Sequence, residues 1–234
     1  MPATTSAGHD NLYIVNSGSG KILIESAYLP PISWFTFAAA AGEVWLDKHE
    51  HFEKRSYRNR CHIAGPNGML RLTVPLMSGK HMLPMSDVKI CNTENWQEHH
   101  WRSICTSYRR SPFFEFYEDR LAPFYQIPQT SIFGLNRDLI IALSGMMGLE
   151  LNLFASTSFM ARPGDDMADL RSLLRPNGPY AGYAEGFRAP VYQQVFGNRT
   201  GFLADLSIID LLFNAGPEAC VIIRNPALRE DPNP

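Results

Sequence analysis

An N-terminal stretch of the sequence constrains the fold most, because it predicts a strand, a helix and a second strand in that order. Residues 21–29 (KILIESAYL) predict a strand, and the two prolines that follow end it because proline lacks the amide donor of a paired strand. Residues 32–41 predict a short buried helix, and residues 43–52 alternate as a second strand. This order is typical of a βαβ unit in an α/β fold, with a mixed or mainly parallel sheet flanked by helices.

A tight reversal predicts a β-hairpin insertion after this unit. Residues 60–64 and 69–76 flank the sequence GPNG, whose Asn-Gly pair tolerates the positive φ of a tight turn. Helical spacing of apolar residues then predicts a helical C-terminal part of the fold. The predicted helices are residues 96–108, 113–125, 135–147, 167–174 and 206–214, and short strands are expected at residues 87–91 and 151–159.

Composition places most of the chain in one domain. Its 234 residues fit a single large domain, and a hydrophobic content of 45% supplies enough apolar material for a core. Only 19% of the residues are charged, which argues against disorder. We expect a flexible, Gly- and Ser-rich leader at residues 1–20, a single α/β domain at residues 21–225 and a tail at residues 226–234.

Charge balance and cysteine usage narrow the class of protein. A formal net charge of −2 with one short basic cluster argues against nucleic-acid binding. No stretch approaches the roughly 18 apolar residues of a membrane span, and the N-terminus has no apolar signal core. The four cysteines form no CxxC pair, which favours isolated buried thiols over a zinc site. We therefore expect a cytoplasmic protein without a membrane span.

The basic cluster lies in the sequence HEHFEKRSYRNRCHI, which begins at residue 49. Four cations fall within seven positions there: Lys54, Arg55, Arg58 and Arg60. One interpretation is a solvated hairpin edge that discourages strand-to-strand aggregation. The other is a site for an anionic small molecule, because arginine and lysine side chains suit phosphate and carboxylate groups, while Asn59 reads a hydroxyl or amide. Ligands collect at the carboxyl ends of strands in α/β sheets, where this segment is expected to emerge.

Two histidines precede these cations. In an extended strand Asp47, His49 and His51 share one face, because side chains alternate. The pair could hold a divalent metal, but no third ligand is identifiable, so we predict no metal site. Half-exposed histidines bonded to their neighbours are a further interpretation. We favour a general acid–base role, with Asp47 fixing the histidine tautomer.

Other polar residues stand in apolar or aromatic surroundings. Tyr28, Tyr192 and Gln193 are candidate binding residues, as is Asp210 within SIIDLLF. A bare carboxylate is costly to bury, so Asp210 either faces water or meets a cation, and we predict a partner from the 54–60 cluster. The motifs GxxxxGK[ST], GxGxxG, GxSxG and HExxH are absent, and the sequence does not identify a cofactor.

An ordered series of short sequences resembles the WbqC-like family of bacteria. The series is AYLPP, HEHFEKRSYRNRCHI, LTVP, DVKI, NW, SYRRSPFFEFY and LSIIDLLFNAGPEA, and it spans residues 21 to 220. The resemblance implies a cytoplasmic protein of surface-polysaccharide (O-antigen) or secondary-metabolite biosynthesis, without naming a reaction. The sequence departs from the family pattern where many members carry Gln-Pro, at residues 25–27, and where many carry Gln, at His51.

These features together predict a transferase, or a related enzyme, that acts on a phosphate-bearing substrate such as a nucleotide-linked sugar or an acyl donor. Lys54, Arg58 and Arg60 hold the anion in this hypothesis, and His49 or His51 moves a proton. The alternative is a non-catalytic ligand-binding or scaffold protein of such a pathway. The sequence does not decide the oligomeric state.

Overall fold

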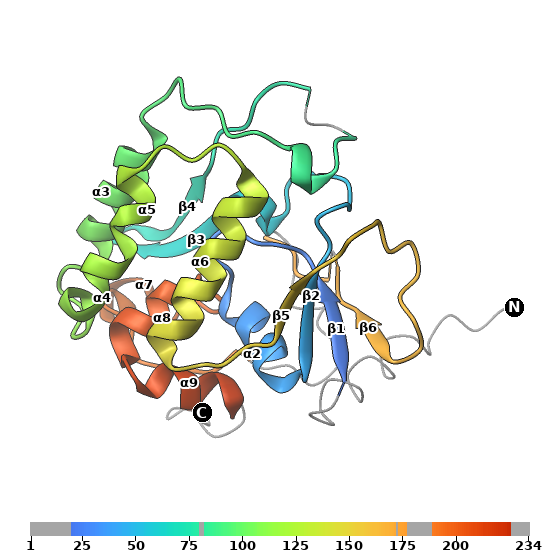
Figure 1. The fold of residues 1–234 in the computed structure, drawn as a ribbon. Coiled ribbons are helices and arrows are strands. Elements are labelled where there is room, and N and C mark those ends of the chain that lie inside the picture. Colours follow the sequence, from blue (N-terminus) through green and yellow to red (C-terminus); the bar gives the residue numbers. More distant parts are fainter. Residues whose placement is uncertain (1–19, 80–81, 172, 177–188, 226–234) are drawn as a thin grey trace, which may run out of the picture.

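The computed structural model describes residues 20–79, 82–171, 173–176 and 189–225 (Figure 1). The predicted tail, and the predicted leader apart from Gly20, lie outside these residues. Within the described ranges, no helix combines the length and the apolar character needed to cross a membrane.

A four-stranded parallel sheet forms one side of the molecule. Its order is β5 (Leu153–Ala155), β2 (Glu43–Leu46), β1 (Lys21–Ile24) and β6 (Met167–Asp169), and all three pairings are parallel. Helix α2 (Ile32–Ala40) connects β1 to β2, which confirms the predicted βαβ unit. Because all four strands run the same way, their carboxyl ends meet at one edge of the sheet.

The predicted strands are longer than the observed ones, and one predicted helix is wrong. Strand β1 ends at Ile24 and β2 ends at Leu46, after which the chain turns. Residues 167–174 were predicted as a helix, but Met167–Asp169 pair with Lys21–Leu23 as strand β6. Hydrogen bonds from β1 stabilise this three-residue strand, and a local sequence pattern does not report such a distant pairing. The strand predicted at residues 87–91 reduces to isolated bridges beyond the 3-10 helix η2 (Met85–Asp87).

The predicted β-hairpin is confirmed. Strands β3 (Arg60–Gly65) and β4 (Gly68–Thr73) pair antiparallel, with Gly65 opposite Gly68. Gly68 has a φ of +112°, a backbone conformation that side chains with a Cβ rarely adopt. The 3-10 helix η1 (Tyr57–Asn59) leads directly into β3 and so ties the basic cluster to the hairpin.

Helices make up the rest of the described fold, which confirms the predicted α/β class with a helical C-terminal part. They are α3 (Trp96–Tyr108), α4 (Phe114–Leu121), α5 (Pro123–Gln126), α6 (Ile132–Met147), α7 (Gly197–Thr200), α8 (Ile208–Ala215) and α9 (Glu218–Arg224). The helix predicted at residues 113–125 is divided in two before Pro123. The hydroxyl of Ser131 caps α6 at 3.2 Å from the amide of Gly134.

The hairpin and the helices share one hydrophobic core with the sheet. Its largest fully buried aromatic side chains are Trp34, Tyr28, Tyr108, Phe35, Phe114 and Phe213. In Figure 1 the parallel sheet lies to the right and α3, α4, α7 and α8 lie to the left, with the hairpin between them. The edge of the parallel sheet and the helices on the opposite side of the molecule are therefore separate places at which a ligand could bind.

Candidate functional site

Polar side chains gather where the parallel strands end. Glu25 follows β1, Asp47 follows β2 and Ser156 follows β5, and all three are fully buried. Asp169 is the last residue of β6. Four separate strands thus deliver polar groups to the carboxyl edge of one sheet, which is where α/β proteins bind their ligands.

Asp47 joins three of these strands through its carboxylate. Its Oδ1 accepts a hydrogen bond of 2.8 Å from the hydroxyl of Ser156, and its Oδ2 pairs with Nη1 of Arg171 at 2.8 Å. Arg171 also forms a two-point contact with Asp169, at 2.9 Å and 2.6 Å. The guanidinium therefore cross-links the ends of β2 and β6 and neutralises the buried Asp47.

A second ion pair lies beside the first. Arg58 and Glu50 are 1% and 5% exposed, and two hydrogen bonds of 2.9 Å and 2.5 Å join their side chains. Glu53 lies 3.6 Å from Arg58 and also pairs with Arg175 at 2.8 Å. Two-point contacts of this kind hold a carboxylate in a fixed orientation.

Burial sets the protonation behaviour of this second pair. Loss of water raises the pKa of Glu50 from 4.5 to about 7. The positive charge of Arg58 lowers this pKa, while the negative charges of Glu25 and Asp47 raise it further. Burial also disfavours the charge of Arg58, but Glu25, Glu50 and Glu53 together outweigh that effect and raise its pKa. Glu50 can therefore give up or take a proton near neutral pH, while Arg58 stays charged.

These groups line a cleft of about 420 Å³. Its lining residues are Glu50, His51, Phe52, Glu53, Arg58, Phe159, Asp169 and Arg171. Phe159 is 50% exposed, and the guanidinium carbon of Arg171 lies 5.6 Å from its ring centroid. An open aromatic face beside carboxylate–arginine pairs can stack against a sugar ring and bond to its hydroxyl groups. We refer to this site as the sheet-edge cleft.

The structure separates the four cations of the basic cluster. Arg58 lines the sheet-edge cleft, but Glu50 and Glu53 already neutralise it, so it is not the open anion ligand that the sequence predicted. Lys54 and Arg55 are exposed, follow the cleft residue Glu53 in the sequence and form no ion pair with any described residue. Arg60 lies on β3, where burial, Arg71 and Arg55 lower its pKa.

The predicted shared face of Asp47, His49 and His51 is wrong. Strand β2 ends at Leu46, and a turn follows, so the three side chains do not alternate. Asp47 accepts a hydrogen bond of 3.0 Å from the backbone amide of His49. His51 lines the sheet-edge cleft, with its ring centroid 6.0 Å from that of Phe159. Among the described residues, no group of three or more His, Cys, Asp or Glu side chains is arranged to hold a metal ion.

Two further candidates have structural contacts. Tyr28 is fully buried, and its hydroxyl lies 2.8 Å from Nδ1 of His100 and 2.9 Å from the hydroxyl of Tyr125. The side-chain amide of Asn59 donates a hydrogen bond of 2.9 Å to the carbonyl of Val74. Tyr28 therefore joins the segment after β1 to α3 and α5, and Asn59 joins η1 to Val74, the residue that follows β4. Neither side chain is among those that line the cleft.

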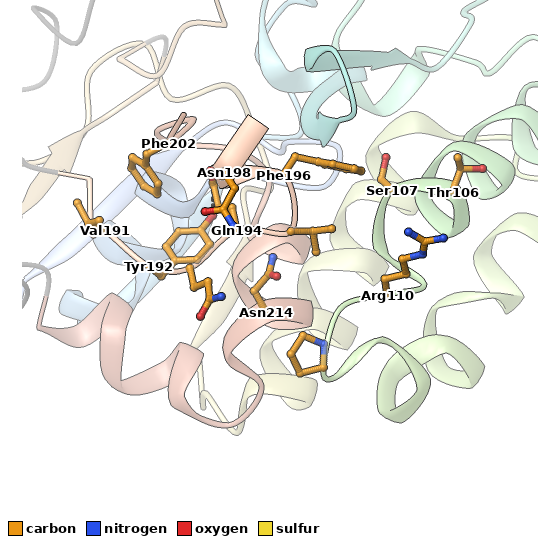
Figure 2. Close-up of a pocket in the computed structure, with 14 residues that line it drawn as sticks. Thr106, Ser107, Arg110, Val191, Tyr192, Gln194, Phe196, Asn198, Phe202 and Asn214 are labelled. Carbon is orange, nitrogen blue, oxygen red and sulfur yellow. Dashed lines mark hydrogen bonds between the residues drawn. The ribbon is translucent and has the colours of Figure 1, made fainter. Parts of the chain in front are cut away.

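The C-terminal candidates lie at a second, larger cavity (Figure 2). Tyr192 and Gln193 line it, and Asp210 is buried behind Tyr192. The prediction that a cation from the 54–60 cluster satisfies Asp210 is wrong. Its Oδ2 instead accepts hydrogen bonds from the hydroxyl of Tyr192 at 2.5 Å and the amide of Gln194 at 3.1 Å.

The sequence analysis missed six of the eight residues that line the sheet-edge cleft: Glu50, Phe52, Glu53, Phe159, Asp169 and Arg171. Glu50 stands between the two histidines that were singled out, and its neighbour in space, Arg58, was taken as a free cation. Asp169 and Arg171 were assigned to a helix, which hid their place at the end of a strand. Phe159 carried no signal, because an isolated phenylalanine after a short strand is usually part of a core.

The fold and the cleft define a small α/β protein with an acid–base cluster at the carboxyl edge of a parallel sheet. The chain belongs to the WbqC-like protein family, whose model matches residues 25–178 and so includes every residue that lines the sheet-edge cleft. The chain is also 27% identical over 227 residues to Rv1507c of Mycobacterium tuberculosis, a protein described as uncharacterized. That similarity covers 84% of this chain and 94% of the relative. No solved structure matches the chain.

Proposed function

We propose that the protein is a small-molecule transferase that acts on a phosphate-bearing activated sugar at the sheet-edge cleft. The observation that carries this proposal is Glu50, a buried carboxylate with a pKa of about 7 that Arg58 holds in the cleft wall. A group that is half ionised near neutral pH suits proton transfer in either direction. The family resemblance supports a role in surface-polysaccharide or secondary-metabolite biosynthesis.

The cleft lining suggests how a sugar substrate would bind. Its ring would stack on the exposed face of Phe159, and its hydroxyl groups would bond to Asp169 and Arg171 at the rim. Its phosphate would meet Lys54 and Arg55, which are exposed and form no ion pair with any described residue. Positive charge at the rim and carboxylates inside thus match the two ends of a sugar phosphate.

Glu50 would act on the nucleophile of the transfer. It would take the proton from an attacking hydroxyl or amine while the nucleophile forms a bond to the transferred group. The phosphate or diphosphate would leave with the electron pair of the broken bond. Arg58 keeps the carboxylate of Glu50 in place throughout, because its two hydrogen bonds fix both oxygen atoms.

Isothermal titration calorimetry with sugar 1-phosphates and nucleotide sugars tests the proposal. We expect one of these compounds to bind, and we expect the double variant Lys54→Ala/Arg55→Ala to weaken that binding tenfold or more. The matched control is Arg60→Ala, which removes a cation of the same segment away from the cleft lining and should leave binding unchanged. Binding of none of the compounds, or equal binding by both variants, would refute the proposed site.

The Glu50→Gln variant separates an enzyme from a binding or scaffold protein. Glutamine keeps the shape of the side chain but cannot take a proton, so binding should persist while function in a cellular complementation assay is lost. The proton-transfer role would be refuted by full complementation with Glu50→Gln, which the scaffold alternative predicts.

A further inference from the structure

A second, larger cavity is separate from the sheet-edge cleft and has a different chemistry. It measures about 810 Å³, within the range of small-molecule sites, and it lies between the C-terminal turn of α3 and residues 191–202. It shares no lining residue with the sheet-edge cleft. Figure 1 places α3, α7 and α8 on the side of the molecule away from the parallel sheet. We refer to it as the α3 cavity.

Flat aromatic faces and side-chain amides make up one wall of the α3 cavity. Figure 2 shows Tyr192, Gln194, Asn198 and Phe202 on this wall, with Phe196 above and Asn214 below. The rings of Tyr192 and Phe202 meet edge to face, with centroids 5.6 Å apart. Aromatic faces stack on planar rings, and an amide both donates and accepts hydrogen bonds, so this wall suits a heteroaromatic ring with polar edges.

Buried hydrogen bonds hold this wall in place. Gln194 uses both ends of its amide on Leu203, donating to the carbonyl at 2.8 Å and accepting from the backbone amide at 2.8 Å. The hydroxyl of Tyr192 is fixed by the buried carboxylate of Asp210. The hydroxyl of Tyr192 and the amide of Gln194 both donate to Oδ2 of Asp210, and Asp210 is not among the residues that line the cavity. The wall is therefore formed before any ligand arrives, which lowers the entropic cost of binding.

The opposite wall carries positive charge. Arg110 is exposed on it and forms no ion pair with any described residue, and none of the 14 lining residues is acidic. A smaller cavity of about 480 Å³ shares Thr106 and Arg110 with this one and adds Arg109, together with Arg102 and its partner Glu98. Arginines at the end of α3 also complement the helix dipole. That effect accounts for their charge but not for the aromatic and amide wall that faces them.

We propose that the α3 cavity binds a nucleotide. The base stacks on the ring of Phe196 and packs beside Tyr192 and Phe202, whose own rings are perpendicular. The side-chain amides of Asn198 and Asn214 bond to its polar edge. The phosphate group lies against Arg110, and Arg109 is placed to bind a second phosphate. This site does not depend on the function proposed for the sheet-edge cleft, because the two sites share no residue.

Calorimetric titration of the full chain with the four ribonucleoside monophosphates, and with the corresponding nucleosides, tests this proposal. We expect at least one nucleotide to bind more tightly than its nucleoside. The Arg110→Ala variant should weaken nucleotide binding tenfold or more and leave nucleoside binding unchanged, because it removes only the phosphate contact. The Phe196→Ala variant should weaken the binding of both.

Two control variants separate this site from its surroundings. Arg137→Ala removes an exposed arginine of α6 that pairs with Asp138 at 2.8 Å and lines neither cavity, and it should leave nucleotide binding unchanged. Glu50→Gln alters the sheet-edge cleft alone and should also leave it unchanged. The proposal is overturned if no nucleotide binds at millimolar concentration. It is equally overturned if Arg110→Ala binds nucleotides as the unaltered chain does while melting at the same temperature.

Discussion

The sheet-edge cleft and the α3 cavity use charge in opposite ways. In the cleft, carboxylates and arginines are buried together and neutralise one another, as Arg58 does with Glu50 and Arg171 does with Asp47. At the α3 cavity, neutral donors bond to Oδ2 of the buried Asp210, and the cation Arg110 is left exposed on the wall. Buried charges are best tolerated when they are paired, and the paired groups of the cleft suit the proton transfer that we propose. The exposed cation of the cavity suits the selection of a ligand by its charge.

The largest difference between the two regions should appear when an arginine is removed. Arg58→Ala leaves Glu50 buried without its main cation, and we expect a loss of about 3–5 kcal/mol in the free energy of unfolding, measured in urea. The double variant Arg58→Met/Glu50→Leu should lose less, because it leaves no unpaired carboxylate. If Arg58→Ala were within about 0.5 kcal/mol of the unaltered chain, the ion pair would not be part of the fold.

The second-largest effect should be a pH dependence of the free energy of unfolding that comes from Glu50. Its pKa is raised from 4.5 in the unfolded chain to about 7 in the folded protein, so folding favours its protonated form. The resulting stability is fully present below pH 4.5 and is lost as the pH rises to about 7, by about 3 kcal/mol in total. Urea titrations at half-unit pH steps should show this loss, and Glu50→Gln should remove it. A Glu50→Gln variant with an unchanged slope would assign the dependence to another group.

A smaller effect is expected at the wall of the α3 cavity. Tyr192→Phe removes the hydroxyl that donates to Asp210, and we expect a loss of about 1–3 kcal/mol at neutral pH. Burial raises the pKa of Asp210 and the hydroxyl of Tyr192 lowers it, so the variant raises that pKa further. Because the hydroxyl favours the ionised carboxylate, the loss should shrink as the pH falls from neutral through the raised pKa of Asp210, and so already above pH 3.8. A loss of stability that is equal at neutral and at acidic pH would mean that the hydroxyl does not act through the charge of Asp210.

The smallest effect should come from Arg110. Its side chain is exposed and has no ion pair among the described residues, so Arg110→Ala should change the free energy of unfolding by less than about 0.5 kcal/mol. Thermal melts of Arg110→Ala and Arg58→Ala side by side measure the contrast directly. A large loss of stability in Arg110→Ala would show that this arginine, like Arg58, forms an ion pair that stabilises the fold.

Local patterns in the sequence were enough to predict most helices and the hairpin. The helix at residues 96–108 and the Asn-Gly reversal follow from spacing and backbone preference, which operate over a few residues. The strand at Met167–Asp169 was not predictable in this way. Its stability comes from pairing with Lys21–Leu23, far away in the chain, and three residues carry no periodic signal of their own.

For the site, local patterns predicted that the segment after the second strand would emerge at the carboxyl edge of the sheet, because a βαβ unit makes its two strands parallel. Which charges meet there is set by folding. Arg58 could face an outside anion or a neighbouring carboxylate, and the fold placed Glu50 against it. The physical reason is that the energy of a buried charge depends on its partners within a few ångströms, and those partners come from strands and turns that are brought together only by folding.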